Sequence, residues 1–344
     1  MTERVGITTT LPIEVPLAAG LAPVDLNNLF IAGEDPEAAV AAAEAAGFPR
    51  TACAWTKGLY TTALTAGFRR VVVVEGGDCS NSAALGEVLA DAGVGVIGFS
   101  YPPRPDATAL TAEIARLAQA VGTTVAAAEE VYRDLAPARA SLAALDELTW
   151  REGRVSPHEN YDWLLASSDF GGEPATFRAR LGAFLTEARA RPAGRDGGRV
   201  RLGLAGVPPI NRGLFEFLNG LGADVVFNEV PGQFALLGGG ATLAEAYTTY
   251  TYPYGVAPRL ADIRAEISRR RLAGIIHYVQ TFCHRGIQDI LLRKHAGVPV
   301  LTLEGERPGP LSGQQRLRLE TFVDVLRPGV TGGRKGAGTR YNNY

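Results

Sequence analysis

The stretch RVVVVEGGDCSNSAALGEVLADAGVGVIGF, residues 70–99, decides the fold class of this chain. It begins with a run of four valines, passes through a glycine-rich turn into a segment of helical length, and ends in a second short apolar run. A buried strand, a helix and another buried strand in succession are typical of a right-handed βαβ unit in a parallel sheet. The stretch therefore predicts an α/β fold with parallel sheets.

The same alternation continues outward along the chain. Further strands are predicted at residues 200–205, 224–227, 274–279 and 298–303, and further helices at residues 107–121, 212–221, 259–271, 286–295 and 314–326. Alternating strands and helices indicate parallel sheets covered on both faces, and here they predict two Rossmann-like domains. The predicted parts are an N-terminal α/β domain, a helical connector, a C-terminal α/β domain and a Gly-rich basic tail: residues 1–122, 123–195, 196–328 and 329–344.

Charge and composition exclude several classes of partner. The 344 residues carry 34 Lys and Arg against 36 Asp and Glu, a formal net charge of −2, and no long basic run. This balance argues against nucleic acid as a partner. The start of the chain lacks the pattern of a signal peptide, and no apolar run approaches the ~20 residues of a membrane span. We therefore expect a soluble, cytoplasmic protein with no membrane partner.

Common nucleotide and hydrolase motifs do not account for the sequence. A G-x-G-x-x-G match at Gly93, Gly95 and Gly98 lies inside a predicted strand, whereas the dinucleotide fingerprint must open a helix. The chain contains no P-loop and no G-x-S-x-G elbow, and no pair of its four histidines has the spacing of a common zinc motif. ATP use within this chain is not predicted.

The three cysteines form a more informative pattern. Cys79 and Cys283 each follow a predicted strand, and all three, Cys53 included, precede a segment of helical composition. The N–H groups and positive dipole at a helix N-terminus stabilise a thiolate or an anionic cluster. A buried cysteine is often only a small apolar side chain, and for any one of them that alternative stays open. Three thiolates together favour an iron–sulfur cluster over tetrahedral zinc, with one iron left open to a ligand.

Several segments in a fixed order carry a resemblance to a known family. They are the N-terminal segment 12–24, Cys53-Ala-Trp-Thr-Lys57, Asp78-Cys79-Ser80, Gly206-Val-Pro-Pro209, the segment 278–284, the segment 297–304 and Arg318-Leu-Glu-Thr-Phe322. Together these segments resemble the 2-hydroxyacyl-CoA dehydratase/benzoyl-CoA reductase family, in the branch of cluster-carrying dehydratase subunits.

The resemblance implies a function and a set of site residues. It implies a 4Fe–4S cluster held by Cys53, Cys79 and Cys283, a homologous subunit as dimer partner, and an acyl-CoA substrate. It also implies a separate ATP-hydrolysing iron–sulfur activator, whose electron generates a ketyl radical from the thioester so that water is eliminated. Ser80, Lys57 and His284 flank the expected ligands and are candidates for proton handling or ligand support.

Two alternatives remain open at this point. One is an ATP-dependent low-potential reductase subunit, similar to benzoyl-CoA reductase or to double-cubane proteins, although a double cube needs more than three cysteines in a chain. The other is a cluster-bearing electron-transfer or maturation protein without a substrate pocket.

Overall fold

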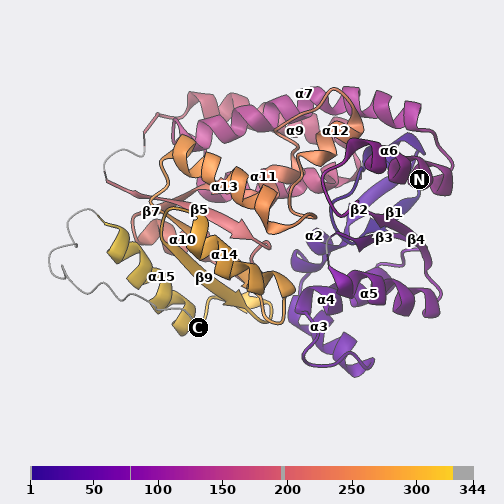
Figure 1. Ribbon diagram of the computed structural model, residues 1–344, viewed down its shortest axis with the longest axis horizontal. Helices are drawn as coiled ribbons and strands as arrows, with labels where there is room; N and C mark the ends of the chain where they lie inside the picture. Colours follow the sequence, from indigo (N-terminus) through magenta and orange to yellow (C-terminus); the bar gives the residue numbers. More distant parts are fainter. Residues whose placement is uncertain (1, 78, 195–197, 328–344) are drawn as a thin grey trace, which may run out of the picture.

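The computed structural model describes residues 2–77, 79–194 and 198–327, and in this part of the chain two four-stranded parallel sheets form the framework (Figure 1). The first sheet has the order β2-β1-β3-β4, and the second has the order β7-β5-β8-β9. Their strands are β1 (Arg4–Ile7), β2 (Ala22–Asp25), β3 (Arg70–Gly76), β4 (Gly95–Ser100), β5 (Val200–Gly206), β7 (Ala223–Asn228), β8 (Gly274–Gln280) and β9 (Val300–Gly305). In each sheet the first strand along the chain pairs with the second on one side and the third on the other.

Helices connect and cover these strands. They are α1 (Glu14–Ala18), α2 (Leu26–Ile31), α3 (Pro36–Ala45), α4 (Ala54–Thr65), α5 (Ser80–Asp91), α6 (Ala107–Val121), α7 (Val125–Trp150), α8 (Pro157–Leu165), α9 (Pro174–Ala190), α10 (Leu214–Gly220), α11 (Glu229–Phe234), α12 (Leu243–Thr248), α13 (Val256–Arg270), α14 (Asp289–His295) and α15 (Gly313–Leu326). Short 3-10 helices lie at η1 (Ala166–Ser168), η2 (Phe170–Gly172) and η3 (His284–Gln288), and β6 (Asn211–Arg212) pairs with β10 (Gly309–Pro310).

The prediction of an α/β fold with parallel sheets is confirmed, and the differences from it have local causes. Strands β1 and β2 were not predicted because each has only four residues, and Pro23 interrupts the second. Proline is tolerated there because β2 is an edge strand. The predicted helix 212–221 begins later, after Gly213, whose φ of +86° ends the short strand β6. The predicted helix 286–295 is divided into η3 and α14.

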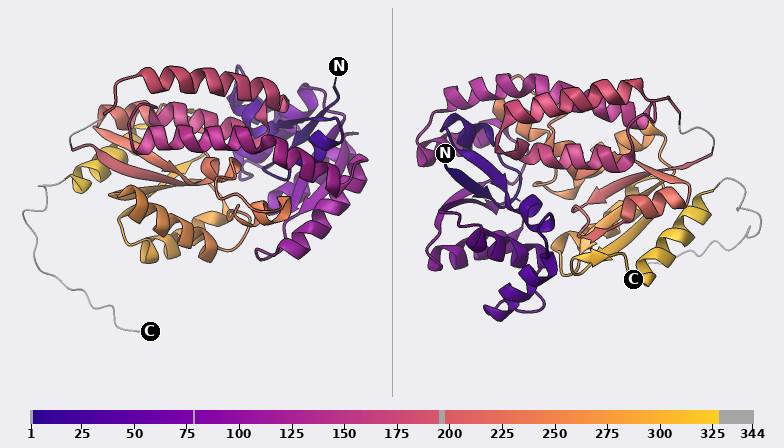
Figure 2. Two further views of the ribbon diagram at one scale, coloured as in Figure 1. Left: turned by 90° about the horizontal axis from the view of Figure 1, so that it is seen from above. Right: turned by 180° about the vertical axis from the view of Figure 1, so that it is seen from behind.

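A helical layer formed by α7 and α9 spans both sheets, and the assignment of residues 123–195 as a connector stays a prediction. Figures 1 and 2 show α7 and α9 running along one side of the molecule from the first sheet to the second. Ala128 and Leu135, in the first half of α7, belong to the same core as Val72 of β3, while Trp150 at the C-terminal end of the helix packs against the cluster that contains Phe227 of β7. The division into Rossmann-like domains stays a prediction, and the predicted tail 329–344 lies outside the described residues.

One segment crosses from the second half to the core of the first. Residues 230–254 follow β7, yet Val230, Phe234, Tyr247 and Tyr250 are buried in the same cluster as Ile7 of β1. The two halves are therefore joined by side-chain packing in addition to the helical layer.

A buried ion pair fixes the carboxyl end of the second sheet. Glu229 and Arg259 have no exposed side-chain surface, and their atoms lie 2.7 Å (Oε1 to Nε) and 2.9 Å (Oε2 to Nη2) apart. The backbone N–H of Gly206, at the end of β5, donates to Glu229 Oε2 at 2.8 Å, and Arg259 also donates to Gln288 at 2.6 Å. Burial raises the pKa of Glu229, but Arg259 and the Gly206 N–H outweigh burial and lower it.

Replacing Arg259 with methionine leaves the Glu229 carboxylate buried without its cation. We expect Arg259→Met to lower the free energy of unfolding by about 3–5 kcal/mol, measured by anaerobic denaturant unfolding. The double variant Glu229→Gln/Arg259→Met recovers much of this loss, because it removes the uncompensated charge while an amide oxygen still accepts from Gly206. Arg116→Met, which breaks an exposed pair with Glu113, serves as control and changes stability by less than about 1 kcal/mol. A double variant no more stable than the single one would contradict this account.

Candidate functional site

A cavity of about 560 Å³ lies where the carboxyl ends of the two sheets meet. Thr8 follows β1 and Asp25 ends β2 on one side, while Val207 follows β5 and Gln280 ends β8 on the other. Open parallel sheets bind ligands outside the carboxyl ends of their strands, at the topological switch point where the strand order reverses. In both sheets the switch point lies between the first and third strands, β1 and β3 in one and β5 and β8 in the other. This is the candidate site.

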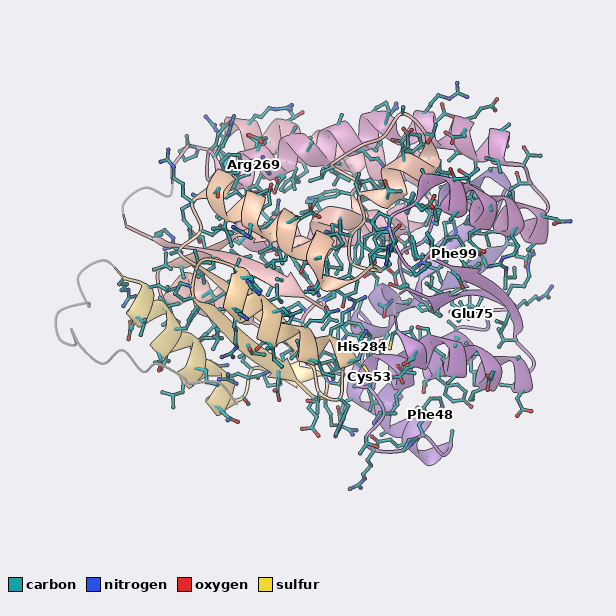
Figure 3. The ribbon with its side chains drawn as sticks, in the orientation of Figure 1. Phe48, Cys53, Glu75, Phe99, Arg269 and His284 are labelled. Atoms are coloured by element: carbon teal, nitrogen blue, oxygen red, sulfur yellow. The ribbon has the colours of Figure 1, made fainter. Side chains whose placement is uncertain are left out.

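All three cysteines line this cavity. Each occupies the N-cap position of a helical segment: Cys53 before α4, Cys79 before α5 and Cys283 before η3. All are partly buried and none forms a disulfide. Figure 3 labels Cys53 and His284, the neighbour of Cys283, near the junction of the two halves, and both residues line the cavity. The structure thus places residues separated by up to 230 positions in the sequence around one cavity.

Opposing effects act on the pKa of the Cys53 thiol. Burial raises the pKa of its thiol, and the nearby Cys283 acts in the same direction. Backbone N–H groups of Thr56 and Trp55, in the first turn of α4, oppose this shift by donating hydrogen bonds to the sulfur. A metal bound to this sulfur would stabilise the thiolate further.

These donors fit an iron–sulfur cluster better than a single ion. In the part of the chain that the structure describes, no three His, Cys, Asp or Glu side chains are close enough to hold one metal ion. A 4Fe–4S cube binds each thiolate through a different iron, so its ligands lie further apart than those of a single ion. The three thiols come from separate helix N-termini and line one cavity, and their role as cluster ligands stays a prediction.

The other predicted residues are distributed unevenly around the cavity. His284 lines it, and burial, Arg285 and Arg259 lower the pKa of its imidazole. Ser80 is exposed at the start of α5, and Ser82, two positions later, lines the cavity instead. Lys57 is buried away from the described lining, with its Nζ 2.7 Å from Glu44 Oε1 and 3.1 Å from the carbonyl of Arg50. The catalytic roles of these three residues stay predictions, and the contacts of Lys57 are those of a structural residue.

Arg285 is a site residue that sequence reasoning missed. Its side chain is buried, its guanidinium lies 3.9 Å from the ring centroid of Tyr252, and its Nη2 donates to the carbonyl of Gly77 at 3.2 Å. It therefore connects the loop that carries Cys283 to the loop that carries Cys79. A basic residue two positions after an expected ligand was the available signal.

A buried carboxyl pair was also missed. Asp25 lines the cavity, and its backbone N–H donates to Asp169 Oδ2 at 2.7 Å. Burial and the charge of Asp25 raise the pKa of Asp169 to about 6, and burial raises the pKa of Asp25 as well. Asp25 stands beside the N-terminal motif, but the sequence holds no sign of Asp169 as its neighbour, because 144 positions separate them.

Comparison with known proteins decides the family. The family model of 2-hydroxyglutaryl-CoA dehydratase, D-component, matches residues 8–326, a region that includes all three cysteines. The chain belongs to this family. The resemblance seen in the sequence motifs is thereby confirmed, and at family level the protein is a dehydratase-type subunit that acts on acyl-CoA substrates. No curated protein matched the chain. Among the described helices of this family member, none is both long and apolar enough to cross a membrane.

The carboxyl pair makes stability depend on pH. Asp25 and Asp169 bind their protons more tightly in the folded chain than in the unfolded one, where such groups titrate near pH 4. Their stabilising contribution is therefore complete below about pH 4 and is lost as the pH rises, with the contribution of Asp169 lost through about pH 6. Between pH 4 and 7 the free energy of unfolding should therefore fall. We expect this fall to be about 1–3 kcal/mol smaller in Asp25→Asn than in the wild type, measured by denaturant unfolding at a series of pH values.

Asp106→Asn provides the matched control for this measurement. Asp106 is an exposed N-cap of α6, and asparagine caps helices equally well. The free energy of unfolding of Asp106→Asn should differ from that of the wild type by the same amount at every pH between 4 and 7. A difference for Asp25→Asn that is equally constant with pH would contradict the coupling of the pair.

Proposed function

We propose that this chain is the 4Fe–4S-carrying subunit of a cytoplasmic 2-hydroxyacyl-CoA dehydratase, with Cys53, Cys79 and Cys283 as the cluster ligands. One observation carries the proposal: in this family member, all three cysteines of the chain line one cavity at the carboxyl ends of both sheets. The proposed partners are a homologous subunit and a separate ATP-hydrolysing iron–sulfur activator.

The bound cluster would supply the low-potential electron that makes a thioester lose water from an unactivated position by a radical route. The chain itself provides the surroundings for this chemistry. N–H groups of the first turn of α4 stabilise the Cys53 thiolate, and Arg285 places a buried positive charge between the loops of Cys79 and Cys283. Both features favour an anionic centre at this position.

Groups that can accept or donate protons also line the cavity. Elimination of water requires removal of a proton from the substrate carbon and protonation of the departing hydroxyl. Asp25 and His284 are the lining side chains we propose for these transfers, since one lies at the end of β2 and the other beside Cys283. Their positions on opposite halves of the molecule suit two separate proton transfers.

The test is turnover under strictly anaerobic conditions. The chain is co-expressed with its homologous subunit and assayed with activator, ATP and reductant on 2-hydroxyacyl-CoA and aryl-CoA thioesters, with products identified by mass spectrometry. We expect loss of water, abolished in Cys283→Ser and retained in Ser141→Ala on α7.

Two other outcomes would overturn the proposal in different ways. Addition of hydrogen without loss of water would identify a reductase subunit of the benzoyl-CoA reductase or double-cubane kind. A cluster that is reduced by the activator but turns over no thioester would indicate an electron-transfer or maturation protein.

A further inference from the structure

A salt-bridge network joins the two halves of the molecule outside the described lining of the cavity. Arg307, in the loop after β9, places its Nε 2.5 Å from Glu37 Oε1 and its Nη1 2.8 Å from Glu44 Oε1. Both glutamates belong to α3, so the guanidinium binds one helix of the first half at two points. The Glu44 oxygen that accepts from Arg307 also accepts from Lys57 Nζ at 2.7 Å. We call these residues, Glu37, Glu44, Lys57 and Arg307, the Arg307 network.

Lys57 makes this network stronger than an exposed salt bridge. Its side chain is buried and that of Glu44 is partly buried, so water screens the contact between them only weakly. A buried ammonium requires a carboxylate partner. The hydrogen bond from Lys57 is the main cause that lowers the pKa of Glu44, and the bond from Arg307 adds to it. The ionised Glu44 carboxylate therefore binds one cation from each half.

Lys57 connects the network to the loop that carries Cys53. Its Nζ donates to the carbonyl of Arg50, which precedes Cys53 in the same loop, at 3.1 Å. Its backbone N–H donates to the carbonyl of Cys53, also at 3.1 Å, in the first turn of α4. The loop before the cysteine and the helix after it are thus both bonded to one residue of the network.

Arg307 connects the network to the loop that carries Cys283. The carbonyl of the preceding residue, Glu306, accepts a hydrogen bond from Gln280 Nε2 at 2.7 Å. Gln280 is buried at the end of β8, and its own carbonyl accepts from the backbone N–H of Cys283 at 2.9 Å. The backbone next to Arg307 is therefore bonded to the turn that presents Cys283.

We propose that the Arg307 network sets the distance between Cys53 and Cys283, and that Arg307 is thereby a positioning residue for the cluster. The two thiols belong to different halves, and the network bonds their loops to each other. A cluster binds its thiolates at fixed separations, so a contact that holds the two loops in place favours binding of one cluster by both halves. The role toward the cluster rests on the proposed function, whereas the distance between the thiols does not.

Thiol cross-linking tests this distance without a cluster. In the full-length Cys79→Ser chain, treated with a chelator to remove iron, Cys53 and Cys283 are the only thiols. Dibromobimane becomes fluorescent when it alkylates two neighbouring thiols, and monobromobimane measures the reactivity of the thiols one by one. We expect Arg307→Met to lower the rate of cross-linking, relative to that of single alkylation, about threefold or more. Arg307→Lys, which retains the charge, should recover part of this loss.

Arg70→Met is the matched control. Arg70 and Glu3 form an ion pair with exposed fractions of 32 % and 46 %, close to the 35 % and 48 % of Arg307 and Glu37, but both lie in the first half. Arg70→Met should lower the denaturant midpoint about as much as Arg307→Met does and leave the cross-linking rate unchanged. An unchanged rate in Arg307→Met, or an equal decrease in Arg70→Met, would overturn the inference.

The cluster-loaded chain provides a second measurement, which decides the question if circular dichroism shows that Cys79→Ser does not fold. The chain with all three cysteines is reconstituted anaerobically, and the release of iron to bathophenanthroline disulfonate is followed by absorbance. We expect release to be about threefold or more faster in Arg307→Met than in the wild type or in Arg70→Met, with partial recovery in Arg307→Lys. Equal rates in all four proteins would contradict the positioning role.

The inference and the proposed function can fail independently. A chain that binds no cluster, but whose cross-linking depends on Arg307, would contradict the proposed function and support the role of Arg307 in setting the distance. A chain that binds the cluster and eliminates water, but whose cross-linking and iron release do not depend on Arg307, would support the proposed function and contradict the inference.

Discussion

The ion pair between Glu229 and Arg259 is the interaction on which the geometry of the site depends. Neither side chain has exposed surface, so each charge is tolerable only because the other is in place. The Glu229 carboxylate accepts a hydrogen bond from the backbone N–H of Gly206 at the end of β5. Arg259 donates a hydrogen bond to Gln288, at the end of the segment that begins with Cys283. Although burial opposes it, Glu229 and, more weakly, Cys283 raise the pKa of Arg259. The pair therefore fixes the sheet edge and the third cysteine loop together.

The two sheets contribute to the site in equivalent ways. Each has its first strand beside its second and third, and in each the third strand leads into a cysteine-bearing loop, β3 into Cys79 and β8 into Cys283. Arg285 connects these equivalent loops through Gly77. Because residues 230–254 pack into the core of the first half, the two sheet edges are held in a fixed relation, and a cavity between them can have a defined shape.

Local sequence patterns predicted the part of this site that depends on single strand–helix units. The apolar strands and the helices after them placed Cys79 and Cys283 at carboxyl strand ends, and a parallel sheet brings such ends to one edge. The motif order then led to the family that the match over residues 8–326 shows. What escaped prediction depends on long-range packing: Asp169 beside Asp25, Arg285 against Tyr252, and the position of residues 230–254. Lys57 was predicted because it flanks Cys53 in the sequence, whereas its contact with Glu44 depends on how α4 packs against α3.

The central claim is that cysteines from both halves hold one cluster. Its most direct test is the iron and acid-labile sulfide content of the anaerobically reconstituted chain, together with the electron paramagnetic resonance spectrum after reduction. The account predicts one 4Fe–4S cluster per chain in the wild type, and a lost or altered cluster in each of Cys53→Ser, Cys79→Ser and Cys283→Ser. A wild-type chain without iron, or a Cys283→Ser variant with an unchanged spectrum, would contradict it.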